Sequence, residues 1–312
     1  MRLLLVLSLF FFFLIDGYSQ DTRGGDKDNN ASRSKNKIGR TLLDDSTKIM
    51  YGMNTTSYIL SSQLLDGDTN FIQVDSSLNN FEKFSVFEKN KMRFQNLGNL
   101  GTPLEDLFDR TPKLFNVSSG FNSLDLYYNV IRNNKFYNTK SPFIDLELIL
   151  GGKGRNKVDF LFTRNINKNW NIGFDIHRIA SDKQIGATKT KGDRNVNSSA
   201  FNFFVYHQSK NKKVKLFSSF LNFSHQILGT GGIDLEIEDL PLEYFLYNDS
   251  EVRLSKVENN DKRKSYNVFF EYKLLKKFKI YANVEYYTQN ISYNDDNLSL
   301  NVFYYDSILN DN

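Results

Sequence analysis

Apolar and polar residues alternate in three successive runs between Phe143 and Ile179. The apolar positions are Leu146, Leu148 and Leu150 in the first run, Val158, Phe160 and Phe162 in the second, and Trp170, Ile172, Phe174 and Ile176 in the third. A period of two places alternate side chains on opposite faces of a β-strand. Short polar stretches at 151–157 and 164–169 separate the runs. The pattern therefore predicts an antiparallel meander with one apolar and one polar face.

Further runs of the same kind continue towards the end of the chain. They cover residues 201–206, 214–223, 266–274 and 278–286, and another starts at 298–305. Within 214–223 the alternation slips near Phe220 and Leu221, which predicts a β-bulge. Several runs approach the 9–11 residues that a tilted membrane strand needs. Two architectures fit: a soluble sandwich with its apolar face against a second sheet, and a barrel with its apolar face in lipid.

The connections between the runs favour the barrel. Residues 165–169, 208–213 and 275–277 are short connections, whereas residues 181–199 and 230–265 are long and polar. Outer-membrane barrels keep short turns on the periplasmic rim and long loops outside. Aromatic residues also lie near many strand ends, as interfacial girdles require.

Composition removes several classes of protein. The mean hydropathy of −0.48 argues against a bundle of membrane helices, but a barrel wall needs only every second residue to be apolar. Aromatic residues make up 15% of the chain, and only four prolines interrupt it. The absence of cysteine excludes disulfides, thiolate catalysis and cysteine-ligated metals. A net charge of +4 with both signs interspersed predicts no nucleic-acid partner.

The sequence divides into four parts. Residues 1–19 combine Arg2, an apolar run over 3–15 and the small residues Gly17 and Ser19, which is typical of a secretory signal peptide. Residues 20–45 are polar and charged, and we expect a disordered leader. Residues 46–140 predict an irregular N-terminal region with short strands, and residues 141–312 the β-meander of the barrel wall.

Four segments resemble the putative porin family of Gram-negative outer-membrane β-barrels. They are QNLGNLGTPLEDLF at 95–108, GFNSLDLYY at 120–128, FYNTKSPFIDLEL at 136–148 and FTRNINKNWNIGFDIHRIASD at 162–182. The resemblance implies an all-β, up-and-down transmembrane barrel in the outer membrane. It carries no catalytic residues over to this chain.

The chain departs from the family in length, because family members usually have more strands. Its last residues, SILNDN, are not the aromatic-ended strand that barrel-assembly machinery reads. Two expectations follow: an incomplete wall belonging to a longer chain, or a small barrel of eight to ten strands packed with side chains.

The functional prediction is a porin-like channel for passive diffusion of small polar solutes, and the expected partners are outer-membrane lipid and barrel-assembly machinery. The expected lumen-lining residues are Glu147, Asp159, Asn171, Asp175, Asn267, Glu271, Asn283 and Glu285. We expect no enzyme activity, cofactor or metal site. One alternative is a non-pore binding, adhesion or structural barrel that acts through the loops at 181–199 and 230–265, and another is a soluble secreted sandwich. The solute and the oligomeric state do not follow from the sequence.

Overall fold

The computed structural model describes residues 55–75, 77, 83, 85–89, 93–96, 98–108, 121–185, 193–233, 252–254, 256–275, 278–299 and 302–305. All of them belong to one compact unit, Met50–Asn312. The predicted signal peptide at 1–19 and leader at 20–45 lie outside the described residues, as do residues 186–192 and 234–251 of the two long loops.

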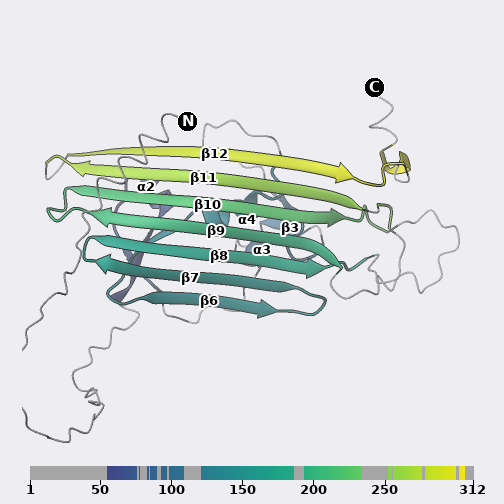
Figure 1. The fold of residues 1–312 in the computed structure, drawn as a ribbon, viewed down its shortest axis with the longest axis horizontal. Helices are drawn as coiled ribbons and strands as arrows, with labels where there is room; N and C mark the ends of the chain where they lie inside the picture. Colours follow the sequence, from purple (N-terminus) through teal and green to yellow (C-terminus); the bar gives the residue numbers. More distant parts are fainter. Residues whose placement is uncertain are drawn as a thin grey trace, which may run out of the picture. The chain divides into compact units, whose positions relative to one another are not determined.

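Seven antiparallel strands form the main sheet, and they lie side by side in sequence order (Figure 1). They are β6 (Phe143–Leu150), β7 (Asn156–Asn167), β8 (Trp170–Asp182), β9 (Arg194–Gln208), β10 (Val214–Gly229), β11 (Val257–Lys273) and β12 (Lys279–Asp295). The predicted antiparallel meander is confirmed. The sheet is open, because β6 and β12 are its two edges and do not pair with each other. Closure into a barrel is therefore not observed among the described residues.

Three details of the predicted strands are corrected. The strands reach far into both predicted loops, because β8 continues to Asp182, β9 begins at Arg194 and β11 begins at Val257. The bulge predicted within 214–223 is wrong, since β10 pairs in continuous register with β9 and β11. The alternation slips there because Phe220 faces one side while the buried Leu221 and Phe223 face the other, so both faces are apolar.

The strand expected at 298–305 is also wrong. After the end of β12 the chain turns and forms a 3-10 helix, η4 (Val302–Tyr305). The Tyr305 hydroxyl donates a hydrogen bond to the Asp295 carboxylate at 2.9 Å, and the Tyr293 and Tyr305 rings meet edge to face. These contacts fold the segment back onto the end of β12.

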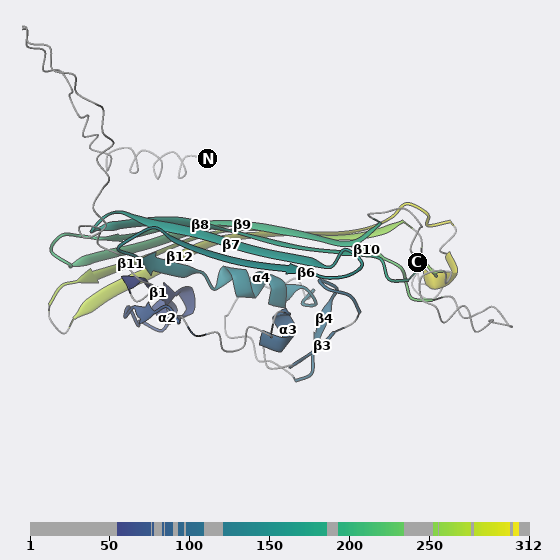
Figure 2. The same cartoon turned by 90° about the horizontal axis from the view of Figure 1, so that it is seen from below.

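The N-terminal elements all lie on one face of the main sheet (Figure 2). A small sheet pairs β2 (Ile72–Gln73), β1 (Ser57–Leu60) and β5 (Lys135–Asn138), and a hairpin pairs β3 (Phe94–Asn96) with β4 (Leu104–Asp106). Three short helices accompany them: α2 (Ser61–Leu65), α3 (Val86–Lys89) and α4 (Asp125–Arg132). We call the covered side of the main sheet the inner face and the opposite side the outward face. Among the described residues, no helix is long and apolar enough to cross a bilayer.

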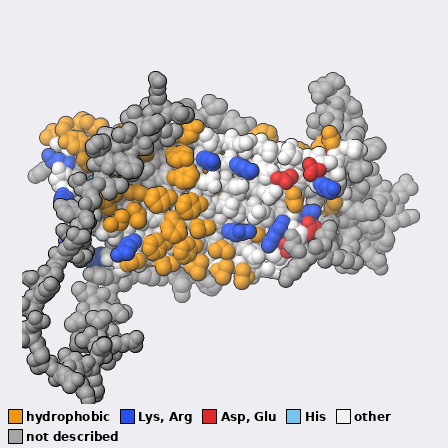
Figure 3. Space-filling model, in the orientation of Figure 1, with side chains coloured by type: hydrophobic (Ala, Val, Ile, Leu, Met, Phe, Trp, Pro, Cys, Tyr) orange, Lys and Arg blue, Asp and Glu red, His pale blue; other side chains and the backbone are white. Residues whose placement is uncertain are grey.

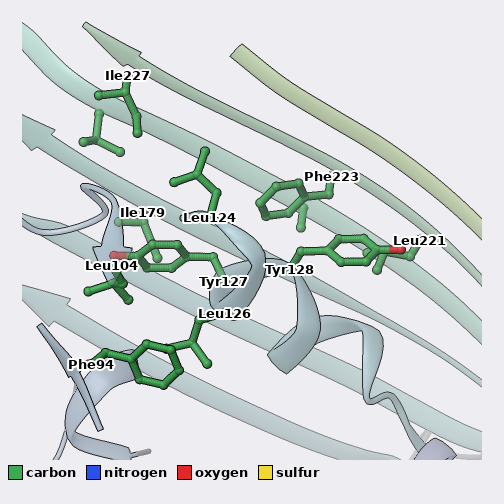
Figure 4. Close-up of a cluster of buried hydrophobic side chains, with 12 residues drawn as sticks. Phe94, Leu104, Leu124, Leu126, Tyr127, Tyr128, Ile179, Leu221, Phe223 and Ile227 are labelled. Carbon is green, nitrogen blue, oxygen red and sulfur yellow. The ribbon is translucent and has the colours of Figure 1, made fainter. Parts of the chain in front are cut away.

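Two apolar clusters join the N-terminal elements to the inner face. In the first, Leu126, Tyr127 and Tyr128 of α4 pack with β3 and β4 against the main sheet; its wall residues include Ile179, Leu221, Phe223 and Ile227 (Figure 4). In the second, residues of β1, α2 and β5 meet Phe204, Tyr206, Phe217 and Phe269 of β9, β10 and β11. Because burial of apolar side chains is the main stabilising term in folding, these clusters make the N-terminal elements part of the core.

Gly101 lies in close contact with the inner face of the sheet. Its φ of +85° favours glycine, and a Cβ there would lie 2.7 Å from Val196 Cγ1. The Gly101 carbonyl accepts a hydrogen bond from the buried His225 Nε2 at 2.8 Å. The chain can therefore lie flat on the inner face only with glycine at this position.

Candidate membrane-facing wall and inner-face polar network

A single row of large apolar side chains crosses the outward face of all seven strands. The row consists of Ile144, Phe162, Phe174, Phe203, Phe220, Tyr266 and Tyr286, each directly opposite its neighbour in the register. The rings of Phe220 and Tyr266 lie 4.6 Å apart, and those of Phe162 and Phe174 5.7 Å apart. Cross-strand aromatic pairs of this kind stabilise a sheet.

The apolar positions above and below this row form a continuous belt. We define the apolar belt as the outward-facing side chains, at every second position, of seven strand segments. The segments are Ile144 to Leu150 on β6, Val158 to Phe162 on β7, Trp170 to Ile176 on β8, Phe201 to Val205 on β9, Val214 to Phe220 on β10, Tyr266 to Tyr272 on β11 and Ile280 to Tyr286 on β12. Ser218 is the one polar residue within it. In the space-filling view, apolar side chains gather towards the short-turn end and acidic ones towards the long-loop end, while Lys and Arg occur at both ends (Figure 3).

The belt crosses the strands obliquely. Tyr286 and Ile144 lie in the same row, yet the belt extends from Tyr286 towards the short turns on β12 and from Ile144 towards the long loops on β6. The midpoint of the belt therefore lies three residues from the row towards the long loops on β6 and three residues from it towards the short turns on β12. This is a total shift of six residues over six strand-to-strand steps. At about 3.4 Å per residue and about 4.8 Å per strand, this is a shift of about 20 Å over about 29 Å, an angle of about 35°. Strands of outer-membrane barrels tilt by about 35–45°.

The strands are longer than the belt. β10, β11 and β12 have 16, 17 and 17 residues, whereas a tilted membrane strand needs about 9–11. Seven residues of each of these strands lie in the belt, or about 24 Å along the strand and about 20 Å along an axis inclined to the strand by that angle. The remaining outward residues towards the long loops are mostly Asn, Ser, Thr, Gln and Lys, so the wall continues as a polar surface.

All eight residues predicted to line a lumen lie on the inner face. The register places Glu147, Asp159, Asp175, Asn171, Glu271, Asn267, Glu285 and Asn283 on the side that carries the N-terminal elements. Asn283 is exposed, Asn267 is half-buried, and Asn171, Asp175 and Glu271 are buried. Sharing this face does not test whether they line a water-filled lumen, and that role stays a prediction.

Three of these residues, Glu147, Asp159 and Asp175, belong to a chain of polar contacts across β6 to β9. Lys157 Nζ lies 2.9 Å from Glu147 and 2.8 Å from Asp159. His177 bridges two carboxylates, with Nδ1 2.8 Å from Asp159 and Nε2 3.1 Å from Asp175. The alternating positive and negative partners neutralise one another on a partly buried surface, where an unpaired charge would be costly.

The polar chain passes from the wall to the N-terminal region. Asn202 Nδ2 donates to Asp175 at 3.0 Å and to Asn134 Oδ1 at 2.8 Å. A second amide path starts at Asn171, whose Nδ2 donates to Asn165 Oδ1 at 2.7 Å, and Asn165 Nδ2 donates to Asn138 at 2.8 Å. These bonds fix β5 and the residue before it to β7, β8 and β9.

Towards the β12 edge of the inner face, two arginines connect α4 to β11 and β12. Arg132 and Glu285 form a bidentate ion pair. Nε of the guanidinium donates to one carboxylate oxygen at 2.9 Å, and Nη2 donates to the other. Burial disfavours the charged form of Arg132, but the hydrogen bond and charge of Glu285 outweigh it and raise the arginine pKa above its ordinary value.

Arg263 forms the most buried ion pair of the inner face. Its Nη1 lies 2.7 Å from Asp125 of α4, and its Nε donates to Asp261 at 2.9 Å. The side chains of Arg263 and Asp261 are each 3% exposed, and the Arg263 guanidinium lies 4.8 Å from the Tyr128 ring centroid. A pair this buried is costly to break, because the remaining charge keeps no partner.

The sequence analysis missed both arginines as site residues. Arg263 lies within a stretch assigned to a loop, because Lys262, Arg263 and Lys264 are all cationic and show no apolar–polar alternation although they lie in β11. Arg132 meets Glu285 across 153 positions of sequence, and no local pattern reports that contact. Among the described residues, no group of His, Asp and Glu side chains is arranged to hold a metal ion.

Comparison with known families gives one match, which covers residues 56–312 and has the description putative porin. No curated protein and no solved structure matches the chain at a significant level. The matched range includes the N-terminal elements from the start of β1 as well as the whole main sheet.

Proposed function

Because this chain belongs to the putative porin family, we propose that it forms the wall of an outer-membrane β-barrel channel for small polar solutes. The observation that carries the proposal is the oblique apolar belt. A soluble sandwich needs an apolar face but has no reason to displace it by six residues across seven strands, an average of one residue per strand-to-strand step. A wall of tilted strands in a flat bilayer needs that displacement.

In the proposed barrel both edges of the sheet acquire partners. Unpaired backbone groups of β6 and β12 would otherwise face hydrocarbon, where each costs several kcal/mol. The short turns lie in the periplasm and the long loops outside. The partners of the chain are then outer-membrane lipid and the machinery that assembles barrels, and no cofactor or nucleic acid takes part.

The solute path runs beside the N-terminal elements. The two apolar clusters fill the inner face over β9 to β11, so water has no path there. The polar side chains that stay accessible on the inner face lie near the two edges, with Asp145 and Asn283 exposed and Glu147 partly so. We therefore place the path along β6 and β12, where the exposed carboxylate of Asp145 on the β6 side favours cations over anions.

A second candidate function is a non-conducting barrel that binds partners through its long loops. The same two clusters favour it, because they make the covering region a permanent part of the core instead of a loose insert. Conductance separates the two candidates, since only a channel passes ions.

The experiment has two stages. Protein from the membrane fraction is first run on SDS gels with and without boiling, and a closed barrel migrates differently when unboiled. Purified protein is then placed in a planar bilayer, where the proposal predicts discrete conductance steps with a preference for cations that falls in Asp145→Asn/Glu147→Gln. A gel shift without conductance supports the non-conducting barrel. Absence of both, with protein recovered without detergent, contradicts both candidates.

A further inference from the structure

The outward face changes character at the edge of the apolar belt nearest the long loops. The next outward residue on each of five strands is exposed and polar, and we call these residues the shoulder row: Arg178, Ser199, Asn222, Lys264 and Thr288. They follow directly the last belt residue of β8, β9, β10, β11 and β12, so the row shares the oblique course of the belt.

The charges of this region have one sign. Arg178, Lys264 and, one outward position further on β11, Lys262 are exposed cations. The residues directly opposite them in the register are Val158 and Ser199 for Arg178, Asn222 and Thr288 for Lys264, and Ser224 and Asn290 for Lys262. No carboxylate therefore faces any of the three across the strands.

The cations also have no ion-pair partner among the residues that the structure describes. The inner-face cations differ, because Lys157, Arg132 and Arg263 each bind a carboxylate. The first acidic outward residue of β11 is Glu258, four residues beyond Lys262 and half-buried. The sheet thus pairs these inner-face cations with carboxylates and leaves the three outward cations without one among the described residues.

We infer that the shoulder row with Lys262 binds the phosphate groups of lipid headgroups in the leaflet at the long-loop end. A cation directly beyond an apolar belt lies at headgroup height, and Lys and Arg there are attracted to anionic lipid. Lys264 and Arg178 are three strands apart, or about 14 Å, so they contact different headgroups. The neighbouring Ser, Asn and Thr side chains supply hydrogen-bond donors to phosphate oxygens. The inference rests on the proposal that the outward face meets lipid.

The test compares lipid binding by the intact protein and two triple variants. Protein in mixed micelles is titrated with phosphatidylglycerol, with phosphatidylcholine and with inorganic phosphate, and the midpoint of heat modification on SDS gels is followed. The shoulder variant is Arg178→Gln/Lys262→Gln/Lys264→Gln. The matched control, Lys210→Gln/Lys212→Gln/Lys213→Gln, removes the same charge from exposed positions in the turn between β9 and β10.

We expect phosphatidylglycerol to raise the midpoint of the intact protein and of the turn variant. Each cation near an anionic surface contributes about fivefold in affinity, so the shoulder variant should bind about 100-fold more weakly. A further variant, Lys262→Arg/Lys264→Arg, keeps the charges and should bind like the intact protein.

Two results would overturn the inference. One is equal binding by the shoulder and turn variants, and the other is the same effect from inorganic phosphate, which would mean a simple anion site. Flotation with phosphatidylcholine vesicles tests the proposed membrane wall independently of the preference for anionic lipid. Protein that floats without preferring anionic lipid contradicts this inference alone, whereas protein that never floats contradicts the membrane wall itself.

Discussion

The two faces of the main sheet are built from the same strands but differ in how their apolar and charged side chains are covered or paired. The inner face mixes apolar clusters with charged residues, and the charges bind one another or the N-terminal elements. The outward face has a continuous apolar belt that no described residue covers, followed by cations without carboxylate partners. The inner face is therefore complete within the chain, whereas the outward face needs an environment to complete it.

The largest effect is expected from breaking the buried pair on the inner face. Arg263→Met leaves Asp261 without its main partner at 3% exposure, which should lower the free energy of unfolding by about 3–5 kcal/mol. Arg178→Met, on the outward face, should change it by less than about 0.5 kcal/mol in zwitterionic lipid. Urea unfolding in liposomes measures both. Similar losses in the two variants would contradict the contrast between the faces.

A charge in the belt tests the outward face directly. Phe203→Arg places a cation in the central row and should cost about 2–4 kcal/mol in a bilayer. Asn197→Arg, an exposed outward position on the same strand beyond the belt, should cost less than about 1 kcal/mol. Unfolding from liposomes gives the two values. If they agree, the belt does not face hydrocarbon.

At Gly101, the energetic cost of steric overlap with the sheet can be measured separately from the cost of the positive φ. Gly101→Ala meets Val196 at 2.7 Å, whereas Gly232→Ala has nearly the same φ, +87°, and nothing within 4 Å. Both substitutions carry the cost of positive φ, so the excess loss in Gly101→Ala, about 1–3 kcal/mol, reports overpacking against the sheet. Denaturant unfolding of the two variants measures it. No excess would mean that the N-terminal region can move off the inner face.

The smallest effect is expected at the rim of the inner face. Lys89 Nζ lies 2.9 Å from Glu147, but the two side chains are 46% and 36% exposed, and Glu147 keeps Lys157. Lys89→Gln should therefore lower the free energy of unfolding by at most about 0.5 kcal/mol. If the free energy of unfolding fell by more than about 1 kcal/mol in the same assay, the result would contradict this prediction. It would mean that the ion pair is much less hydrated than the exposure of its side chains indicates.

The belt was predictable because its outward positions are apolar, whereas many of the alternate inner positions in the same runs are polar or charged. Runs such as Trp170 to Ile176 show that alternation directly. Beyond the belt both faces are polar or mixed, so Asn259 to Ser265 has the composition of a loop although it lies in β11. The strand ends were therefore missed for a physical reason, since a wall in water does not need apolar residues on its outer side.

The inner face was predictable only in part. The phase of alternation placed Glu147, Asp175 and Glu285 on one face, but it carries no information about what covers that face. The helix α4 and the apolar clusters it forms were not predicted, because their contacts join segments far apart in the sequence. Local pattern thus gives the orientation of a side chain, and only the tertiary fold gives its partner.

The surplus length of the strands sets the height at which the loops begin. On β11, the eight residues from Lys264 back to Val257 extend beyond the belt, or about 27 Å along the strand and about 22 Å above the hydrocarbon at a tilt near 35°. In the proposed orientation the bases of the long loops thus stand clear of the lipid headgroups. A molecule that docks on the loops would contact the ends of the strands above the bilayer surface. It would neither contact the bilayer nor compete with the lipids bound around the wall.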